Sequence, residues 1–173
     1  SLDGGSTWED EAVDTLGASE DASAMAVAGQ NLVVVSGAVA SLSYADLDLL
    51  GTWTEVTDGF VATKYPNDIF SLSSTLTWIA AEDGYIYFSD DPSQGVTVQA
   101  DGSATAEDLH CIHACDSRNV IAGGEAGALL VTSNGGTAWA LSPSVPGGIG
   151  TITACWMRTS HSWLIGDNNR SEE

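Results

Sequence analysis

A short turn-like motif recurs along this chain and constrains its fold more than any other feature. The segment SLDGGSTW at 1–8 returns as TSNGGTAW at 132–139, with a Ser or Thr, an Asp or Asn, a Gly and a Trp in matching places. Two partial copies of this turn motif lie between them, one ending in Trp53 and one, SDDPSQGVTV, at 89–98. The last aligned residues stand at positions 8, 53, 98 and 139, so the copies are 45, 45 and 41 residues apart. A regular period of this size is typical of repeat architectures.

The segments between the copies repeat as well. Each unit carries three short stretches rich in Val, Ile and aromatic residues, such as DIFSLSS, LTWIAAEDG and YIYFSDD, and a fourth stretch begins at the end of the motif. Gly, Asn and Asp separate the stretches, as expected for β-strands joined by short turns, and no window has helical periodicity. This pattern predicts an all-β chain, a β-propeller of four-stranded antiparallel blades with about four blades. We expect one domain, 1–173, with blade units at 1–13 (partial), 24–57, 68–100, 109–142 and 150–173 (partial).

The pattern S/T-x-D/N-x-G-x-x-W resembles the Asp-box, or bacterial neuraminidase repeat, over essentially the whole chain. Two copies are full and two are degenerate. Such repeats occur in sialidases and other glycoside hydrolases, in photosystem II stability/assembly factors, in sorting receptors, and in viral tail and surface proteins. The resemblance implies that each motif is a fold-stabilising hairpin on the rim opposite the usual ligand face.

The residue types of the turn motif indicate structural roles. Asp or Asn accepts backbone N–H bonds within a turn, Gly adopts the left-handed conformation, and Trp packs between sheets. We assign such roles, and no catalytic role, to Ser1, Asp3, Gly5, Trp8, Trp53, Asp91, Gly95, Thr132, Asn134, Gly136 and Trp139.

The number of blades leaves two kinds of ring open. Asp-box propellers more often have six to eight blades, for which this chain supplies about half. We therefore favour a larger ring completed by further sequence or by another chain. The alternative is a closed four-blade ring, in which residues 1–13 complete the last blade as its outer strand.

The charge balance excludes several classes of partner. The chain has 24 acidic residues and four basic ones, Lys64, Arg118, Arg158 and Arg170, and a net charge of −20. It cannot neutralise nucleic-acid phosphates, and an anionic membrane surface repels it. No apolar run approaches the length that crosses a bilayer, so no membrane insertion is expected. The composition resembles that of extreme halophiles, with an acidic extracellular protein of a marine organism as the alternative.

One mouth of the central channel is the expected ligand face. The turns between the second and third strands of the units carry Glu82, Asp83, Glu125 and Asp167. These side chains could bind a cation or position an acid and a base. The alternative is that they are ordinary acidic hairpin turns.

The long connector at 58–67 runs between two blades on the same side. It holds Phe60 and Tyr65 beside Lys64, the sole lysine. Aromatic rings with one cation could contact a sugar or a protein partner. The alternative is a loop anchored by its own aromatic residues, which we favour.

Cys111, His113 and Cys115 alternate on one face of an expected inner strand and are the candidates for a metal site. Neighbours two apart on a strand lie about 7 Å apart, and no fourth ligand is evident, so packing roles are favoured and no cofactor is expected. Aligning IHAC at 112–115 with ITAC at 152–155 predicts that Cys115 and Cys155 fill one repeated packing slot. Three cysteines are too few for a disulfide framework, although one bridge plus a free thiol stays open.

These observations favour a non-enzymatic binding or structural module with protein partners in a larger assembly. We expect a surface or virion component, tail or capsid-associated, from a high-salt environment, acting in assembly or in host or glycan attachment. The alternative is an Asp-box glycoside hydrolase or lyase that uses the channel-mouth carboxylates. A sialidase is disfavoured because Arg118, Arg158 and Arg170 are not placed to form a carboxylate clamp.

Overall fold

The structure is a computed structural model that describes residues 21–48, 52–143, 145 and 149–168. Within these residues the regular structure is almost entirely β, in three four-stranded sheets and one two-stranded sheet, with two single 3-10 turns. No helix in the described part of the chain is long and apolar enough to cross a membrane.

We name the sheets A to D in chain order. Sheet A contains β1 (Ala22–Ala28), β2 (Asn31–Ser36), β3 (Leu42–Asp46) and β4 (Thr54–Val56). Sheet B contains β5 (Pro66–Ser73), β6 (Leu76–Ala81), β7 (Tyr85–Ser89) and β8 (Thr97–Asp101). Sheet C contains β9 (Leu109–Ala114), β10 (Val120–Gly124), β11 (Leu129–Thr132) and β12 (Ala140–Leu141). Sheet D contains β13 (Ile152–Thr159) and β14 (Ser162–Asp167).

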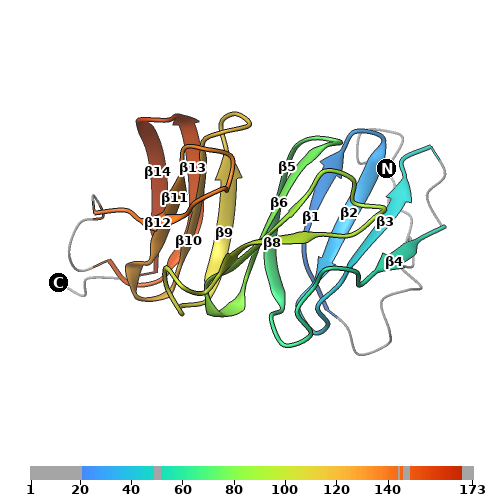
Figure 1. Cartoon of the computed structure of the whole chain (residues 1–173), viewed down its shortest axis with the longest axis horizontal. Coiled ribbons are helices and arrows are strands. Elements are labelled where there is room, and N and C mark those ends of the chain that lie inside the picture. The colour runs from blue at the N-terminus through green and yellow to red at the C-terminus, as the bar shows by residue number, and fades with distance from the viewer. Residues whose placement is uncertain (1–20, 49–51, 144, 146–148, 169–173) are drawn as a thin grey trace, which may run out of the picture.

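Each sheet is a meander of consecutive antiparallel strands, and the sheets follow one another in a row (Figure 1). The first strands lie against one another, β1 on β5, β5 on β9 and β9 on β13. In the blades of a propeller the first strand is innermost and the later strands fan outward. The sheets have this arrangement, so the predicted all-β propeller is confirmed. Sheets A and D lie at opposite ends of the row and do not close a ring (Figure 1).

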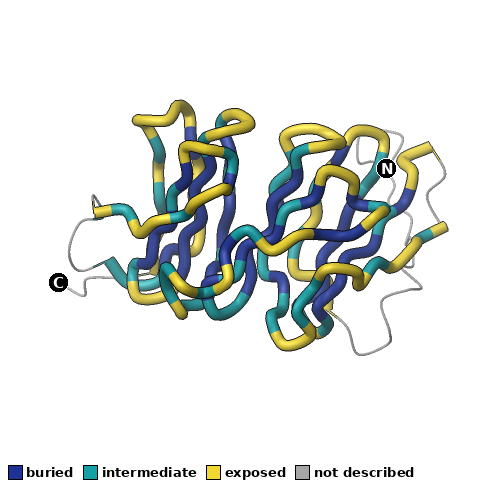
Figure 2. Tube along the Cα trace, in the orientation of Figure 1, coloured by how far each residue is buried: buried dark blue, intermediate teal, exposed yellow. Residues whose placement is uncertain are grey.

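Three apolar clusters hold the sheets together. Val33 and Leu42 of sheet A pack with Ile79 and Tyr87 of sheet B. The opposite face of sheet B, which includes Trp78, packs on sheet C, and a third cluster joins sheets C and D. The second strand of sheet B, LTWIAA, is apolar on both faces because each face meets a neighbouring sheet. NLVVVS of sheet A has the same apolar pattern, although only one of its faces meets a neighbouring sheet among the described residues. Figure 2 shows the buried residues gathered in the strands and the exposed ones in the loops and along β14.

One backbone hydrogen bond repeats in every sheet and gives the structural alignment of the blades. The residue that begins the turn after the second strand donates its N–H to the carbonyl just before the first strand. The four bonds run from Gly37 to Asp21 (3.0 Å), from Glu82 to Tyr65 (3.1 Å), from Glu125 to Asp108 (2.9 Å) and from Asn168 to Thr151 (3.1 Å). Positions matched by this bond are called equivalent below.

Candidate functional site

The turn motif of sheet C is a closed hydrogen-bond unit. The Thr132 hydroxyl donates to Asn134 Oδ1 (2.8 Å) and accepts the N–H groups of Asn134 (3.3 Å) and Gly136 (3.1 Å). Asn134 Oδ1 also accepts the N–H of Ala138 (3.0 Å). Gly136 has a φ of 90°, which only glycine adopts without strain. The Thr132 hydroxyl and Asn134 Oδ1 are thus engaged within the turn itself.

The copy in sheet B is a looser version of the same turn. Asp91 Oδ1 accepts the N–H (3.0 Å) and the hydroxyl (2.7 Å) of Ser93, and Gly95 has a φ of 110°. The strand pairing makes Val96 the equivalent of Trp139, so the sequence alignment, which used Val98, is wrong by two residues. Val96 is 6% exposed and Val98 41% exposed, because only the former faces the core.

The remaining copies are described in part. Trp53 is half-buried directly before β4, at the position that Trp139 occupies before β12. Ser1, Asp3, Gly5 and Trp8, together with the unit at 1–13, lie outside the described residues.

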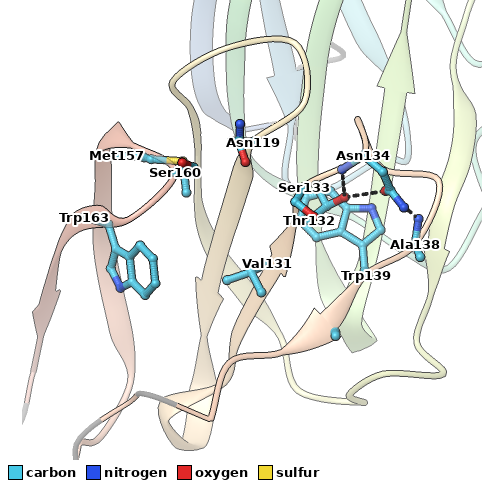
Figure 3. Close-up of a pocket in the computed structure, with 11 residues that line it drawn as sticks. Asn119, Val131, Thr132, Ser133, Asn134, Ala138, Trp139, Met157, Ser160 and Trp163 are labelled. Atoms are coloured by element: carbon cyan, nitrogen blue, oxygen red, sulfur yellow. Dashed lines mark hydrogen bonds between the residues drawn. The ribbon is translucent and has the colours of Figure 1, made fainter.

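A groove of about 350 Å³ lies beside the sheet C motif, between sheets C and D (Figure 3). Its apolar lining comes from Val131, Trp139, Met157 and Trp163. Amide and hydroxyl groups also line it, from Asn119, Ser133, Asn134 and Ser160. The sequence did not single out Trp163 or Asn119, because neither lies in the turn motif. Asn119 belongs to the β9–β10 turn of sheet C, and Trp163 on β14 packs against the cluster between sheets C and D.

The channel-mouth residues of sheet B meet the connector. Lys64 Nζ forms an ion pair with the Asp83 carboxylate and lies 5.5 Å from the centre of the Tyr85 ring. The hydrogen bond to Asp83 is the main cause that raises the pKa of Lys64. The Asp83 N–H donates to Asp108 Oδ1 (2.9 Å), which ties this turn to the start of sheet C. The sole lysine is therefore paired within the chain.

The sequence predicted equivalent positions for the acidic residues of these turns, but not all of them are equivalent in the structure. Glu82 and Glu125 are equivalent, and Glu125 Oε1 lies 3.7 Å from His110 Nε2. Asp167 is not equivalent to them, since Asn168 occupies that position and Asp167 is the last residue of β14. The residues that follow the second strands are thus carboxylates in sheets B and C and an amide in sheet D.

The connector aromatics are anchored to sheet B. The Phe60 ring packs on Tyr87 with centroids 4.8 Å apart, and the Tyr87 hydroxyl donates to the Lys64 carbonyl (3.2 Å). Burial raises the pKa of Tyr87 to about 12. Phe60 and Tyr65 also line a second cavity of about 360 Å³ against the turn at 38–40.

The metal candidates Cys111, His113 and Cys115 do not converge. The Cys111 thiol donates to the Gly123 carbonyl (3.7 Å) and that of Cys115 to Asp116 (3.7 Å). His113 Nδ1 accepts the N–H of Met157 (3.2 Å), and burial lowers the pKa of its imidazole. Among the described residues no group of three or more His, Cys, Asp or Glu side chains could hold a metal ion.

The predicted common slot for Cys115 and Cys155 is wrong. The repeated hydrogen bond makes Cys155 equivalent to Ile112, in the middle of β13, whereas Cys115 lies beyond the end of β9. The ring that matches His113 is Trp156, and the two centroids are 6.0 Å apart. The identity between IHAC and ITAC gave the wrong alignment, because in the structure the two strands align three residues away from that match.

Both ends of the row leave apolar positions uncovered. Leu164 is equivalent to Val33, Trp78 and Ile121, which are fully buried, yet it is 69% exposed. At the other end Met25 is 66% exposed, whereas its equivalents Ile69 and Ile112 are 5% and 3% exposed. Each end face therefore carries an exposed apolar side chain, although Val34, which pairs with Met25 in sheet A, is 3% exposed.

The comparisons with known proteins agree with this architecture. No family model and no curated protein matches the chain. YCF48 from Cyanidioschyzon merolae is similar in structure with a TM-score of 0.63, at 14% identity over 82% of this chain and 46% of that one. YCF48 bound to D1 peptide has the same score and coverage at 17% identity. The computationally designed Ika4 protein reaches 0.67 at 13% identity, over 88% of each chain.

At these identities the likeness shows the fold alone. The chain spans about half the length of the YCF48 chains it matches and most of the length of Ika4. It has the β-propeller fold, in the form of a row of blades that does not close.

Proposed function

We propose that this chain is a non-enzymatic binding and assembly module whose exposed end faces take up further propeller blades. The observation that carries the proposal is the exposure of Leu164 and Met25 at positions that are buried in the inner sheets. Burying such side chains is favourable by roughly 1.5–3 kcal/mol each, so the end faces favour a partner. The partner that fits is another β-sheet, because a sheet covers the same positions at the three inner interfaces.

A second copy of the chain is the occupant we favour for these faces. Head-to-tail contact of the sheet A end with the sheet D end of another copy would reproduce the existing order of blades and could close a symmetric ring. The YCF48 chains are nearly twice as long as this one, which supports a ring of two such halves. One of them is bound to D1 peptide, which supports a role in protein binding for this chain also.

The finer hypothesis is an Asp-box module on a virion or cell surface in a high-salt environment. The net charge of −20 supports it, because molar salt screens the repulsion between such chains within a few ångströms. Host or glycan attachment would use the groove beside Trp139 and Trp163, where indole rings lie among amides and hydroxyls. Paired indole and amide groups suit the apolar faces and hydroxyls of a sugar ring.

The glycosidase alternative has less support. Asp83 is engaged with Lys64, and Asp68, whose pKa burial raises, accepts the Ile112 N–H (2.8 Å) inside an interface between sheets. Neither arrangement resembles an acid and a base held on either side of a substrate.

Light scattering in molar salt tests the assembly. We expect a mass above the 17.8 kDa of one chain, and a return to that mass in Leu164→Asp and Met25→Asp. Leu141→Asp is the matched control, since Leu141 is exposed on β12 away from both end faces. A monomer at every concentration, or equal masses for all four proteins, would contradict the proposal.

A further inference from the structure

We propose that Cys111 and Cys155 form a reversible disulfide that joins sheet C to sheet D. Both residues lie in the cluster between these sheets, Cys111 on β9 and Cys155 on β13. The inference is independent of the proposed assembly, because both thiols lie within one chain and away from its end faces.

The repeat places these two side chains opposite each other. Cys111 is equivalent to Asp68 and Cys155 is equivalent to Ile112, so the pair occupies the place that Asp68 and Ile112 occupy between sheets B and C. There the Asp68 carboxylate reaches across to the Ile112 N–H at 2.8 Å. A short side chain therefore spans the gap between neighbouring inner strands at this position.

The contacts of the two thiols converge on β10. The Cys111 thiol donates to the Gly123 carbonyl (3.7 Å) and the Cys155 thiol to the Ile121 carbonyl (4.0 Å). The proximity of the Cys111 thiol, followed by burial, raises the pKa of Cys155. Gly123 leaves space for Cys111 and Ile152, since a Cβ there would lie 2.9 Å from Cys111 Sγ and 2.5 Å from Ile152 Cγ2. Both thiols thus lie against β10, in the interface between sheets C and D.

Cys115 is the thiol left over. It lies past the end of β9, and its Sγ bonds to the Asp116 carboxylate (3.7 Å). Burial and the negative charge of Asp116 raise the pKa of Cys115. We expect Cys115 to stay outside the bond, because its thiol contacts Asp116 and the residue lies on neither β9 nor β13.

A small-molecule disulfide such as oxidised glutathione can serve as the oxidant for this bond. A thiolate of the pair attacks the reagent and releases one reduced thiol, and the second cysteine then attacks the mixed disulfide and releases another. The protein loses two electrons and two protons, and the reagent gains them. Because Cys111 is buried and Cys155 is partly buried, we expect this reaction to take hours.

The bond would stabilise the less covered end of the molecule. Sheet D has two described strands, and the bond would close a loop of about 44 residues that includes the rest of sheet C. Closing a loop of this length constrains the unfolded chain, and we expect the melting temperature to rise by roughly 5–15 °C.

The test compares the wild-type chain with Cys115→Ser, Cys111→Ser and Cys155→Ser. Each folded protein is incubated with excess oxidised glutathione, alkylated, and measured by mass spectrometry with its melting temperature. We expect wild type and Cys115→Ser to lose two hydrogen atoms, and trypsin to yield peptides 65–118 and 119–158 joined until reduction. Cys111→Ser and Cys155→Ser should form no bond within the chain.

Two results would overturn the proposal. One is a bond between Cys115 and Cys155 in folded Cys111→Ser, which would show that proximity does not select the pair. The other is Cys115→Ser that stays reduced when folded, although the same reagent oxidises it in denaturant. Cys111→Ala repeats the comparison if the serine variant does not fold.

Discussion

Sheets B and D contain the same strand positions in different surroundings. In sheet B the second strand lies between two neighbouring sheets, and Trp78 is fully buried. In sheet D the equivalent residue, Leu164, is 69% exposed because the described structure ends on that side. A repeated apolar residue is thus only a potential core residue, and the presence of a neighbouring blade decides whether it is buried.

The strongest way to sharpen this comparison is to truncate both residues. Trp78→Ala should lower the free energy of unfolding by about 3–5 kcal/mol, because it opens a cavity in the core between sheets B and C. Leu164→Ala should change it by less than about 0.5 kcal/mol, as for most exposed sites. Urea denaturation of the monomeric chain measures both. Equal losses would show that sheet D is already covered.

The turn motif offers a second comparison. Thr132→Ala removes the hydroxyl that serves two N–H groups and Asn134, and should cost about 1–3 kcal/mol. Ser89→Ala in sheet B removes a single bond, to the Gly95 carbonyl (2.7 Å), and should cost about 1 kcal/mol. Urea midpoints would rank the two. A larger loss at Ser89 would reverse the order of the two turns.

The buried carboxyl group of Asp68 on β5 should make the stability of the chain depend on pH. Burial raises the pKa of Asp68, so its contribution to stability is complete below the ordinary Asp value of about 3.9 and is lost as pH rises through the higher folded pKa. Asp68→Asn removes this loss, and the advantage of the variant over wild type should grow across that window in urea titrations.

The matched control for Asp68 has the opposite sign. Backbone N–H donors, first that of Arg118, lower the pKa of Asp116. Its contribution is therefore present above the ordinary Asp value and is lost as pH falls through the folded pKa. Asp116→Asn should lose its disadvantage at low pH. The same sign of pH dependence for both variants would refute the assignment.

The smallest effect is expected at the channel mouth. Lys64→Met removes the ion pair with Asp83, which lies in contact with solvent, and should lower the melting temperature slightly at low salt. In molar salt the difference should vanish, because the attraction is screened. Asp83→Asn should behave in the same way. A salt-independent loss would point instead to packing of Lys64 on Tyr85.

Much of the fold could be predicted from the sequence. The period of the turn motif, the three apolar stretches in each unit and the acidic turns between strands are local patterns, and the four sheets follow them. The equivalence of Glu82 and Glu125 was also readable, since both follow an apolar second strand. The alignment of β9 with β13 was harder to predict, because the sequences IHAC and ITAC are similar, whereas in the structure His113 lies beside Trp156.

The candidate sites depended more on contacts between blades. The groove of Trp139 and Trp163, the pairing of Lys64 with Asp83 and the meeting of Cys111 with Cys155 join residues of different elements. No spacing in the sequence predicts them. The groove and the approach of the two cysteines depend on how neighbouring blades face one another, and the ion pair depends on how the connector lies against the turn after β6.

The sequence by itself determined the repeat, the strand content and the strong negative charge, since propensity, turn chemistry and composition are properties of short segments. The tertiary structure alone decided which face of each strand is covered, which thiols meet and which apolar residues are left at the ends. Those outcomes depend on the distance between strands of separate blades, which local sequence does not encode.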